Sequence, residues 1–558
     1  MQNSFFRKFD LDHVLITASL ALGLVHVWFG RYAMNPDGVS YLDVGDAFLH
    51  RDWNVAVNAW WSPLYPWTMG VVLGIVKPSA RLEFTVVHLV NLAIFVASLF
   101  AFRFLLRGFL HLLRKKQSKA LSESALYLLG YPVFLWIALE VETVYDVSPD
   151  LAVLAFFCLS LGMLIRLGPD DHASKFALLG LILGLGYWTK SILFPIGFAV
   201  LIAGFLWKRA SKSWRRGMLL AGVAFLSSAA PLIFLLSHQK GRFTFGDSGR
   251  VNYAWAVSPR TATRNWQGVE QGSGTPAHAT RQLMKYPPVF EFDGPVVGTY
   301  PPWTDPSYWN EGLQWHFSLK GEFEVLVTTV PSEIRLLFLD HPNLVAGVLI
   351  LALLSWPFFL DGLRELWPFV VLPVLGLGIY LPIIENDRYL GGFVLALFLA
   401  LFACVRVPPE KQKIASYVAL AVFITMAIGT TDYTVRIVTH HLAIPGNGPN
   451  STTADLLVAD KLREMGASPG TKVAIIGDGT GAYWARLGKL KIVAEIMGMG
   501  HGPAAFWNSS DEVRQQVYEV FHNAHAKFVV TACPLCPRDT MAQWQQVAHT
   551  YYCVRRLE

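Results

Sequence analysis

The sequence predicts a polytopic α-helical membrane protein of about 11 transmembrane helices that ends in a small extracytoplasmic α/β domain. Hydrophobic residues make up 53% of the 558 residues and charged residues only 15%, which is too apolar for a soluble globular protein of this size. The mean hydropathy of +0.39 agrees with this. Apolar runs recur as far as about residue 431, and a soluble composition follows. The predicted domains are therefore 1–431 and 432–558.

The predicted spans are the apolar runs that approach the length needed to cross a bilayer, about 20 residues. The run 176–207 is too long for one span and short for two. Because the loops on both sides of it are predicted to be cytoplasmic, we expect it to cross twice, with a tight turn at Gly186–Ser191. The other predicted spans are 11–30, 82–106, 121–139, 150–167, 217–236, 341–360, 366–384, 389–405 and 415–431.

Short loops rich in lysine and arginine favour the cytoplasmic side of a membrane. Three such loops, 107–119, 208–216 and 405–413, set the orientation. They predict a multi-pass protein of the cell (inner or plasma) membrane with a cytoplasmic N-terminus, an extracytoplasmic C-terminus and large external loops at 31–67 and 238–340. The formal net charge is +6, and no lysine and arginine cluster of the nucleic-acid-binding type is present. No nucleic-acid partner is therefore expected.

The C-terminal domain is predicted to alternate helices and strands. Segments 472–478 and 527–532 are typical of buried strands, whereas 453–466 and 509–524 have helical periodicity. The sequence GDGTG at 477–481 lacks the spacing of a dinucleotide-binding motif, so we interpret it as a strand-to-helix turn.

Two cysteines of this domain, Cys533 and Cys536, form a CxxC pair. A redox or metal site would suit this spacing, but there is no second CxxC or paired histidine. We predict a structural disulfide in the oxidising outer compartment, with Cys553 as an alternative partner.

The first external loop combines aspartates with tryptophans and tyrosines immediately after a predicted span. Asp37 lies between Pro36 and Gly38, a pairing that forms tight turns and can aim a short side chain back toward the membrane. Helix capping is a sufficient account of the three aspartates that follow, namely Asp43, Asp46 and Asp52. The alternative for the whole loop is a solvated connection with an aromatic belt at the membrane interface.

Two basic residues are predicted at the same outer membrane edge. Lys190 lies in the predicted hairpin turn, and Arg388 begins a late span in the sequence IENDRYL. An arginine at this depth can make two parallel hydrogen bonds to a phosphate. The alternatives are a snorkelling lysine at a helix end and an ion pair of Arg388 with Asp387 or Glu385.

Four motifs in this order resemble those of the GT-C glycosyltransferases, in the branch that includes protein O-mannosyltransferases and aminoarabinose transferases. They are NPDGVSY (35–41), SPLYPW (62–67), GLGYWTKS (184–191) and NDRYLGG (386–392), and the resemblance covers about the first 430 residues. The chain departs from the family pattern in two places. Gly38 follows the first-loop aspartate where a second acid is common, and Ser62 replaces a basic residue before the proline motif.

The resemblance implies transfer of a sugar from a polyprenyl-phosphate donor to an acceptor hydroxyl on a lipid, glycan or protein, with inversion. Asp37 would be the general base, and Lys190 and Arg388 would stabilise the leaving phosphate. Tyr389, Asp43 and Tyr65 complete the predicted substrate-binding residues. No cofactor is expected; a divalent cation is compatible with carboxylates and phosphate, but no acidic ligand motif requires one.

Two other classes of function remain open from the sequence. The number of spans would suit a transporter, although transporters tend to have repeated halves and polar breaks at the bilayer midplane. A non-catalytic membrane protein that binds envelope glycans would also use large outer loops and an α/β domain. Replacement of Asp37 distinguishes the enzyme from both of these classes, because only an enzyme would then fail to form its product.

Overall fold

The protein, described by a computed structural model, divides into two compact units that are each assembled from three stretches of chain. The first unit comprises Met1–Gly30, Leu89–Val257 and Leu319–Thr439. The second comprises Arg31–His88, Ser258–Ser318 and His440–Glu558, so the units interleave and do not follow the consecutive division at 431 and 432. The described residues are 11–115, 120–257, 264–267, 274–278, 280–292, 297–314, 317–384, 386–443, 452–497, 502–532 and 543–557.

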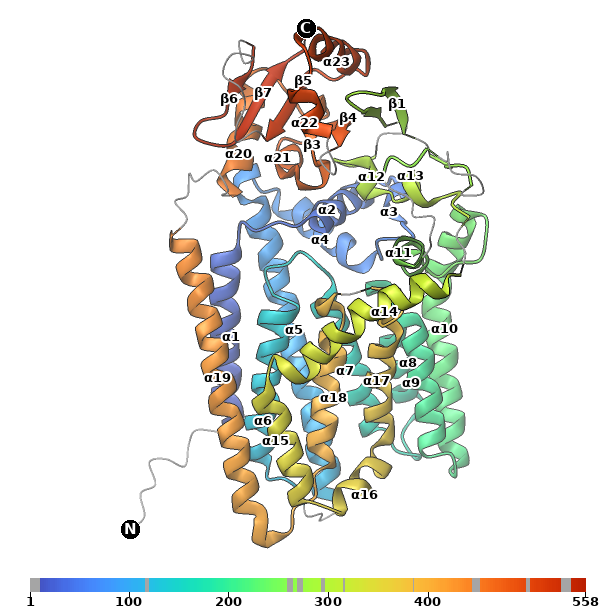
Figure 1. Cartoon of the computed structure of the whole chain (residues 1–558). Helices are drawn as coiled ribbons and strands as arrows, with labels where there is room; N and C mark the ends of the chain where they lie inside the picture. The colour runs from blue at the N-terminus through green and yellow to red at the C-terminus, as the bar shows by residue number, and fades with distance from the viewer. Residues whose placement is uncertain are drawn as a thin grey trace. The chain divides into compact units, whose positions relative to one another are not determined.

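The first unit is a bundle of helices (Figure 1). Two of them end in a short π-helical turn, α6 at Ile137–Val141 and α14 at Arg335–Leu339. Helix α5 (Ala80–Lys115) begins in the second unit and continues into this one. The other helices are α1 (Leu11–Gly30), α6 (Glu123–Trp136), α7 (Asp150–Arg166), α8 (Ala173–Thr189), α9 (Leu193–Trp207), α10 (Lys212–Lys240), α11 (Ser248–Ala256), α14 (Leu319–Ile334), α15 (Pro342–Leu354), α16 (Phe358–Glu365), α17 (Trp367–Tyr380), α18 (Gly391–Cys404) and α19 (Gln412–Ala443).

Most predicted spans lie in one helix, but the predicted span 341–360 covers α15, a break at 355–357 and the first residues of α16. Among the described residues, five helices are long and apolar enough to cross a membrane by themselves, and up to seven spans result if each of two bent pairs counts as one. Helices α8, α9 and α18 are apolar but shorter. The count of about 11 therefore stays a prediction.

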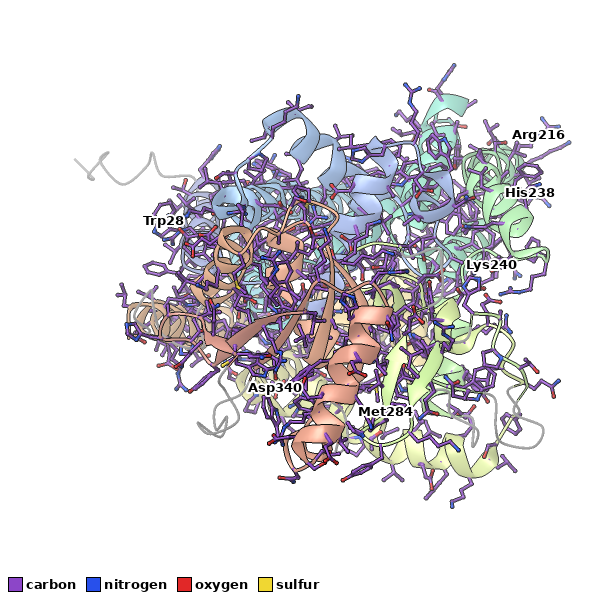
Figure 2. The ribbon with its side chains drawn as sticks, turned by 90° about the horizontal axis from the view of Figure 1, so that it is seen from above. Trp28, Arg216, His238, Lys240, Met284 and Asp340 are labelled. Carbon is purple, nitrogen blue, oxygen red and sulfur yellow. The ribbon has the colours of Figure 1, made fainter. Side chains whose placement is uncertain are left out.

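The predicted hairpin in the run 176–207 is present as two helices, α8 and α9, separated by Lys190–Ile192. Helix α10 follows, and Ser211 begins it by accepting a hydrogen bond from the Trp214 backbone N–H at 3.3 Å. Gly241, with a φ of 62°, ends it in the left-handed conformation that glycine adopts without strain. Arg216 and Lys240, both labelled in Figure 2, lie near opposite ends of α10 in the sequence.

The stretch predicted as the second external loop contains a long helical segment. Its C-terminal part, from Leu319 to Asp340, belongs to the first unit. With α15 it forms a pair that is bent by 67° and is apolar enough to span or re-enter a membrane. Interspersed charges such as Glu322 and Glu333 lower the apolar content of this segment, which explains why its hydropathy did not reveal it.

The second unit contains a seven-stranded mixed sheet in the order β1-β2-β4-β3-β5-β7-β6 (Figure 1). The central strands β4, β3 and β5 are parallel. The strands are β1 (Arg281–Met284), β2 (Val289–Glu291), β3 (Lys472–Gly477), β4 (Lys491–Met497), β5 (Phe528–Ala532), β6 (Gln545–Gln546) and β7 (Tyr552–Arg556). The helices are α2 (Pro36–Leu49), α3 (Trp53–Ala56), α4 (Leu64–Val76), α12 (Pro301–Thr304), α13 (Ser307–Asn310), α20 (Thr452–Glu464), α21 (Tyr483–Leu487), α22 (Gly502–Trp507) and α23 (Asp511–Asn523).

The elements predicted for the C-terminal segment are all present. Strands β3 and β5 and helices α20 and α23 lie within two residues of the predicted bounds, and GDGTG turns from β3 through a short 3-10 helix into α21. Ser510 caps α23 by accepting from the Val513 N–H at 3.4 Å. The N-terminal strands β1 and β2 join this sheet through β4, which no local pattern predicted.

Of the three cysteines considered for the predicted disulfide, one lies among the described residues. Cys533 and Cys536 lie outside the described residues. Cys553 is a buried free thiol in β7.

We predict that close packing of α8 against α10 depends on Gly180 and Gly184. A Cβ atom at Gly180 would overlap the backbone oxygen of Ala221, and one at Gly184 would overlap the hydroxyl of Ser228. Small residues four apart allow such close approach of membrane helices. Gly180→Ala should therefore destabilise the purified protein by about 1–3 kcal/mol in thermal unfolding.

The matched control is Gly378→Ala in α17, where a Cβ atom would meet nothing within 4 Å. This change should be neutral or stabilising because alanine has the higher helix propensity. Equal thermal stability of the two variants would contradict the packing argument.

Candidate functional site

The first unit brings Lys190 and Arg388 together around one carboxylate. Lys190 Nζ lies 2.5 Å from Asp150 Oδ1, and Arg388 Nε lies 3.3 Å from Asp150 Oδ2. The Tyr389 ring lies beneath Lys190, with Nζ 3.5 Å from the ring centroid, and Arg388 Cζ is 5.3 Å from the same centroid. We call Asp150, Lys190, Arg388 and Tyr389 the cationic cluster.

The local structure explains how residues so far apart in sequence converge. Lys190 is the C-cap of α8, Asp150 is the first residue of α7, and Arg388 and Tyr389 form a short 3-10 helix just before α18. Helix α7 packs against both α8 and α18. The ends of three neighbouring helices therefore meet at Asp150.

The observed partners of these basic residues bear on the two alternatives. Asp387 pairs with Arg335 and not with Arg388, and Glu385 lies outside the described residues. A further partner of Arg388 is Asp146, whose carboxylate lies 3.9 Å from Nη1. Lys190 is bound to a buried carboxylate, since Asp150 is 2% exposed, which a lysine snorkelling only to reach water would not require.

In the second unit, Asp37 lies in the first turn of α2 and accepts a hydrogen bond from the Trp303 indole N–H at 3.3 Å. The predicted tight turn is instead a helix start. Pro36 occupies the first helical position, where its fixed φ is already helical and its missing N–H is not needed. The side chain of Asp37 is half-buried, and the helix N-terminus favours a carboxylate there.

Glycines at the contact of α2 with α4 allow the two helices to approach closely. A Cβ atom on Gly45 would lie 2.6 Å from the Pro66 backbone oxygen, and one on Gly70 would overlap the Gly45 backbone. The two helix backbones therefore touch directly, which fixes the position of the Asp37 turn.

Asp43 belongs to a buried network and does not cap a helix. It accepts hydrogen bonds from the Thr299 backbone N–H at 2.7 Å and the Thr299 hydroxyl at 2.9 Å, and it pairs with Arg486 at 3.0 Å. Arg486 also reaches Asp46 at 2.6 Å and Glu83 at 2.7 Å. Asp43 and Asp46 both lie inside α2, so their partners and not capping account for them.

The network carries more negative than positive charge. Lys489 joins it at 3.1 Å from Glu83, so two cations face three carboxylates. Burial acts to raise the pKa of Asp46, but Arg486 and Lys489 outweigh burial and hold that pKa below its ordinary value.

Two residues predicted to bind substrate have partners within the protein. The oxygens of Asp43 are occupied by Thr299 and Arg486. Tyr65 is 2% exposed and packs edge-to-face on Tyr41 with ring centroids 5.1 Å apart. The aromatic proline motif thus builds the core beside α2, because Trp61 packs on the same Tyr41 ring at 4.9 Å.

Sequence reasoning missed the partner cations of this network. Arg486 and Lys489 lie in and just after α21, in a segment that carried no prediction. The signal that could have found Arg486 is its position among apolar residues in AYWARL, where a charge needs a partner. Among the described residues, no group of three or more histidine, cysteine, aspartate or glutamate side chains is arranged to hold a metal ion.

By sequence, the chain matches no family profile and no curated protein. By structure, it is similar to ArnT from Cupriavidus metallidurans bound to undecaprenyl phosphate, with a TM-score of 0.56 and 12% identity over 98% of this chain and 97% of that one. The apo state of the same protein gives 0.53 and 12% over 97% and 98%. The Archaeoglobus fulgidus oligosaccharyltransferase tethered with an acceptor peptide matches over 95% of this chain and 70% of that one, at 12% identity and a TM-score of 0.45.

The two ArnT comparisons show that this chain shares the fold of that protein, which agrees with the fold that the motif resemblance predicted. The two ArnT alignments span nearly all of both chains, so the shared fold includes the C-terminal segment, beyond the 430 residues that the motifs covered. At 12% identity the likeness establishes the fold alone. The chemistry depends on the residues of this chain.

We predict that Arg486 is required for the stability of the second unit. Its side chain is 2% exposed and neutralises buried carboxylates. Arg486→Gln should cost about 3–5 kcal/mol, because it leaves uncompensated charge in the interior. Limited proteolysis and thermal unfolding of the purified protein would measure this loss.

The matched control is Lys489→Gln, which removes the cation whose side chain is 44% exposed. Solvent screens such a group, so the change should cost no more than about 1 kcal/mol. If both variants were as stable as the wild type, the network would not hold the unit together.

Proposed function

We propose that the protein transfers a sugar from a polyprenyl-phosphate donor to an acceptor hydroxyl at the outer face of the cell membrane, with inversion at the anomeric carbon. The observation that carries the proposal is the cationic cluster. It contains a lysine and an arginine at adjoining helix ends within a fold shared with a protein solved with undecaprenyl phosphate bound. The predicted orientation, with about 11 spans and the C-terminal segment outside, belongs to this proposal.

The geometry of the cationic cluster suits exchange of one carboxylate for a phosphate. Arg388 holds Asp150 closely but meets Asp146 only at 3.9 Å, and the Asp146 side chain is 34% exposed. An incoming phosphate can replace Asp146 while Asp150 keeps both cations in place. The guanidinium plane then offers parallel N–H donors to two phosphate oxygens, and Lys190 supplies a second charge for the leaving group.

In this proposal Asp37 removes the proton from the acceptor hydroxyl as it attacks the anomeric carbon. The C–O bond to the acceptor forms while the bond from the anomeric carbon to the phosphate oxygen breaks, and the electron pair leaves with the phosphate. The Trp303 hydrogen bond orients the Asp37 carboxylate, so its position does not depend on substrate. Tyr389 supports the charge of Lys190 through its ring face.

We predict that Asp37→Asn lowers transfer by about two or more orders of magnitude, because the amide keeps the shape and loses the basicity. Product would be measured by mass spectrometry of envelope lipids and glycans from cells that contain the wild type, the variant or no protein. Binding of undecaprenyl phosphate, read as a thermal shift of the purified protein, should be unchanged.

The control for this experiment is Asp52→Asn in the same stretch, since Asp52 is exposed and its side chain makes no cap hydrogen bond to α3. It should retain wild-type product. Normal transfer by Asp37→Asn would remove the proposed base.

We predict that Arg388→Ala reduces both transfer and the thermal shift that undecaprenyl phosphate produces. Arg388→Lys should restore them only in part, because a point charge cannot make the bidentate contact. Arg436→Ala is the control, since the Arg436 side chain is 76% exposed and pairs with Asp432 one turn earlier in the same helix. Full activity and an unchanged shift in Arg388→Ala would exclude a phosphate role.

A further inference from the structure

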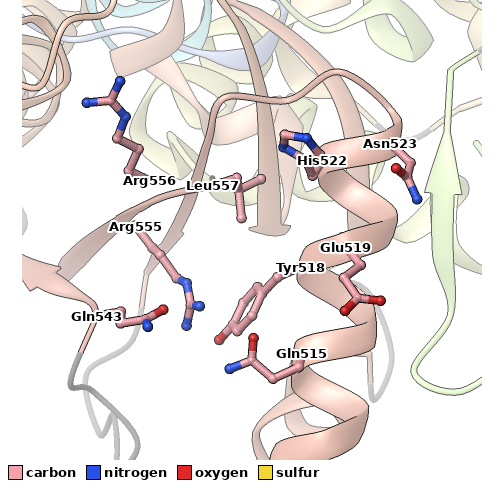
Figure 3. A pocket seen from close by; sticks show the side chains of 9 residues that line it. All are labelled: Gln515, Tyr518, Glu519, His522, Asn523, Gln543, Arg555, Arg556 and Leu557. Carbon is pink, nitrogen blue, oxygen red and sulfur yellow. The ribbon is translucent and has the colours of Figure 1, made fainter.

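A cavity of about 460 Å³ lies in the second unit between α23 and the end of β7 (Figure 3). Its place follows from the register of the sheet. Strand β6 pairs with β7 only at Cys553 and Val554, so Arg555 lies one residue past that pairing. Beyond the two pairs that β6 makes, the end of β7 has no strand beside it on that edge among the described residues. The cavity lies there, between the end of β7 and α23.

One face of α23 supplies the opposite wall. Gln515, Tyr518, Glu519 and His522 occur at spacings of three and four residues, which places them along one side of the helix. Figure 3 shows the side chains of Gln515 and Tyr518 directed toward Arg555, with Gln543 on the far side. The wall is therefore polar, and it combines amides with one carboxylate.

Arg555 is the buried charge of this cavity. It is 9% exposed, its Cζ lies 3.7 Å from the centroid of the Tyr518 ring, and Tyr518 is itself fixed by a hydrogen bond from the Trp544 indole N–H at 3.0 Å. The Arg555 Nε is buried and finds no hydrogen-bond partner among the described residues. A preorganised guanidinium with an unused donor is suited to a planar carboxylate.

We propose that this cavity binds a hexuronic acid unit, that is, a sugar that carries a carboxylate. The carboxylate pairs with Arg555, and the amides of Gln515 and Gln543 each offer a donor and an acceptor to ring hydroxyls. Glu519 accepts from further hydroxyls and, as a negative charge, disfavours a second anionic group. The volume is in the range of small-ligand sites. The inference does not depend on the proposed transfer reaction, because none of the residues that line the cavity takes part in that reaction.

The test is saturation-transfer NMR with the full chain in lipid nanodiscs, titrated separately with glucuronate, glucose and N-acetylalanine. Glucuronate should bind at least about tenfold more tightly than glucose, which lacks the charge, and than N-acetylalanine, which has one carboxylate but lacks the ring hydroxyls. Equal affinity for glucose would overturn the role of Arg555. Equal affinity for N-acetylalanine would show a carboxylate or peptide site and overturn the sugar assignment.

The variants separate binding from folding. Arg555→Gln should weaken glucuronate binding by at least about tenfold, and Gln515→Ala by about threefold or more. Gln516→Ala is the matched control, because Gln516 is the exposed neighbour on α23 and does not line the cavity. If Arg555→Gln fails to fold, the glucuronate affinities of Gln515→Ala and Gln516→Ala decide whether the cavity binds the sugar. No saturation transfer to glucuronate, or equal binding in Gln515→Ala and Gln516→Ala, contradicts the proposal.

Discussion

The carboxylate of Asp43 is the point on which the second unit depends. Asp43 lies in the first of the three stretches that form this unit, Thr299 lies in the second, and Arg486 lies in the third. All three meet at one buried side chain. Thr299 and Arg486 lie 256 and 443 residues from Asp43 along the chain. Hydrogen bonds and an ion pair thus join them in an interior where neither partner can return to water without unfolding.

This constraint shapes what α2 can do. Because Asp43, Asp46 and the glycine contact with α4 fix the helix, the turn that carries Asp37 is presented from a rigid element. The cationic cluster shows the same design in the first unit, since one buried aspartate holds two cations at the ends of neighbouring helices. In both places a buried carboxylate positions the groups that we propose to act on substrate.

Much of the fold could be predicted from the sequence because it rests on local patterns. The apolar runs, the α8–α9 hairpin, strands β3 and β5 and the start of α23 each follow from periodicity, length or capping residues. The interleaving of the two units could not, because it depends on pairings such as Phe290 with Glu495 that no local pattern encodes. The candidate site divides in the same way. Motifs located Lys190 and Arg388, whereas Asp150 as their shared partner and Arg486 required the structure.

The central claim is that the cationic cluster receives the phosphate of a polyprenyl lipid. The most direct measurement is a cryo-EM structure of the protein in nanodiscs with added undecaprenyl phosphate. We expect phosphate density within hydrogen-bond distance of Lys190 and Arg388, with Arg388 turned from Asp146 and still paired with Asp150. Phosphate bound elsewhere, with the contacts of Arg388 to Asp146 and Asp150 unchanged, would contradict the account.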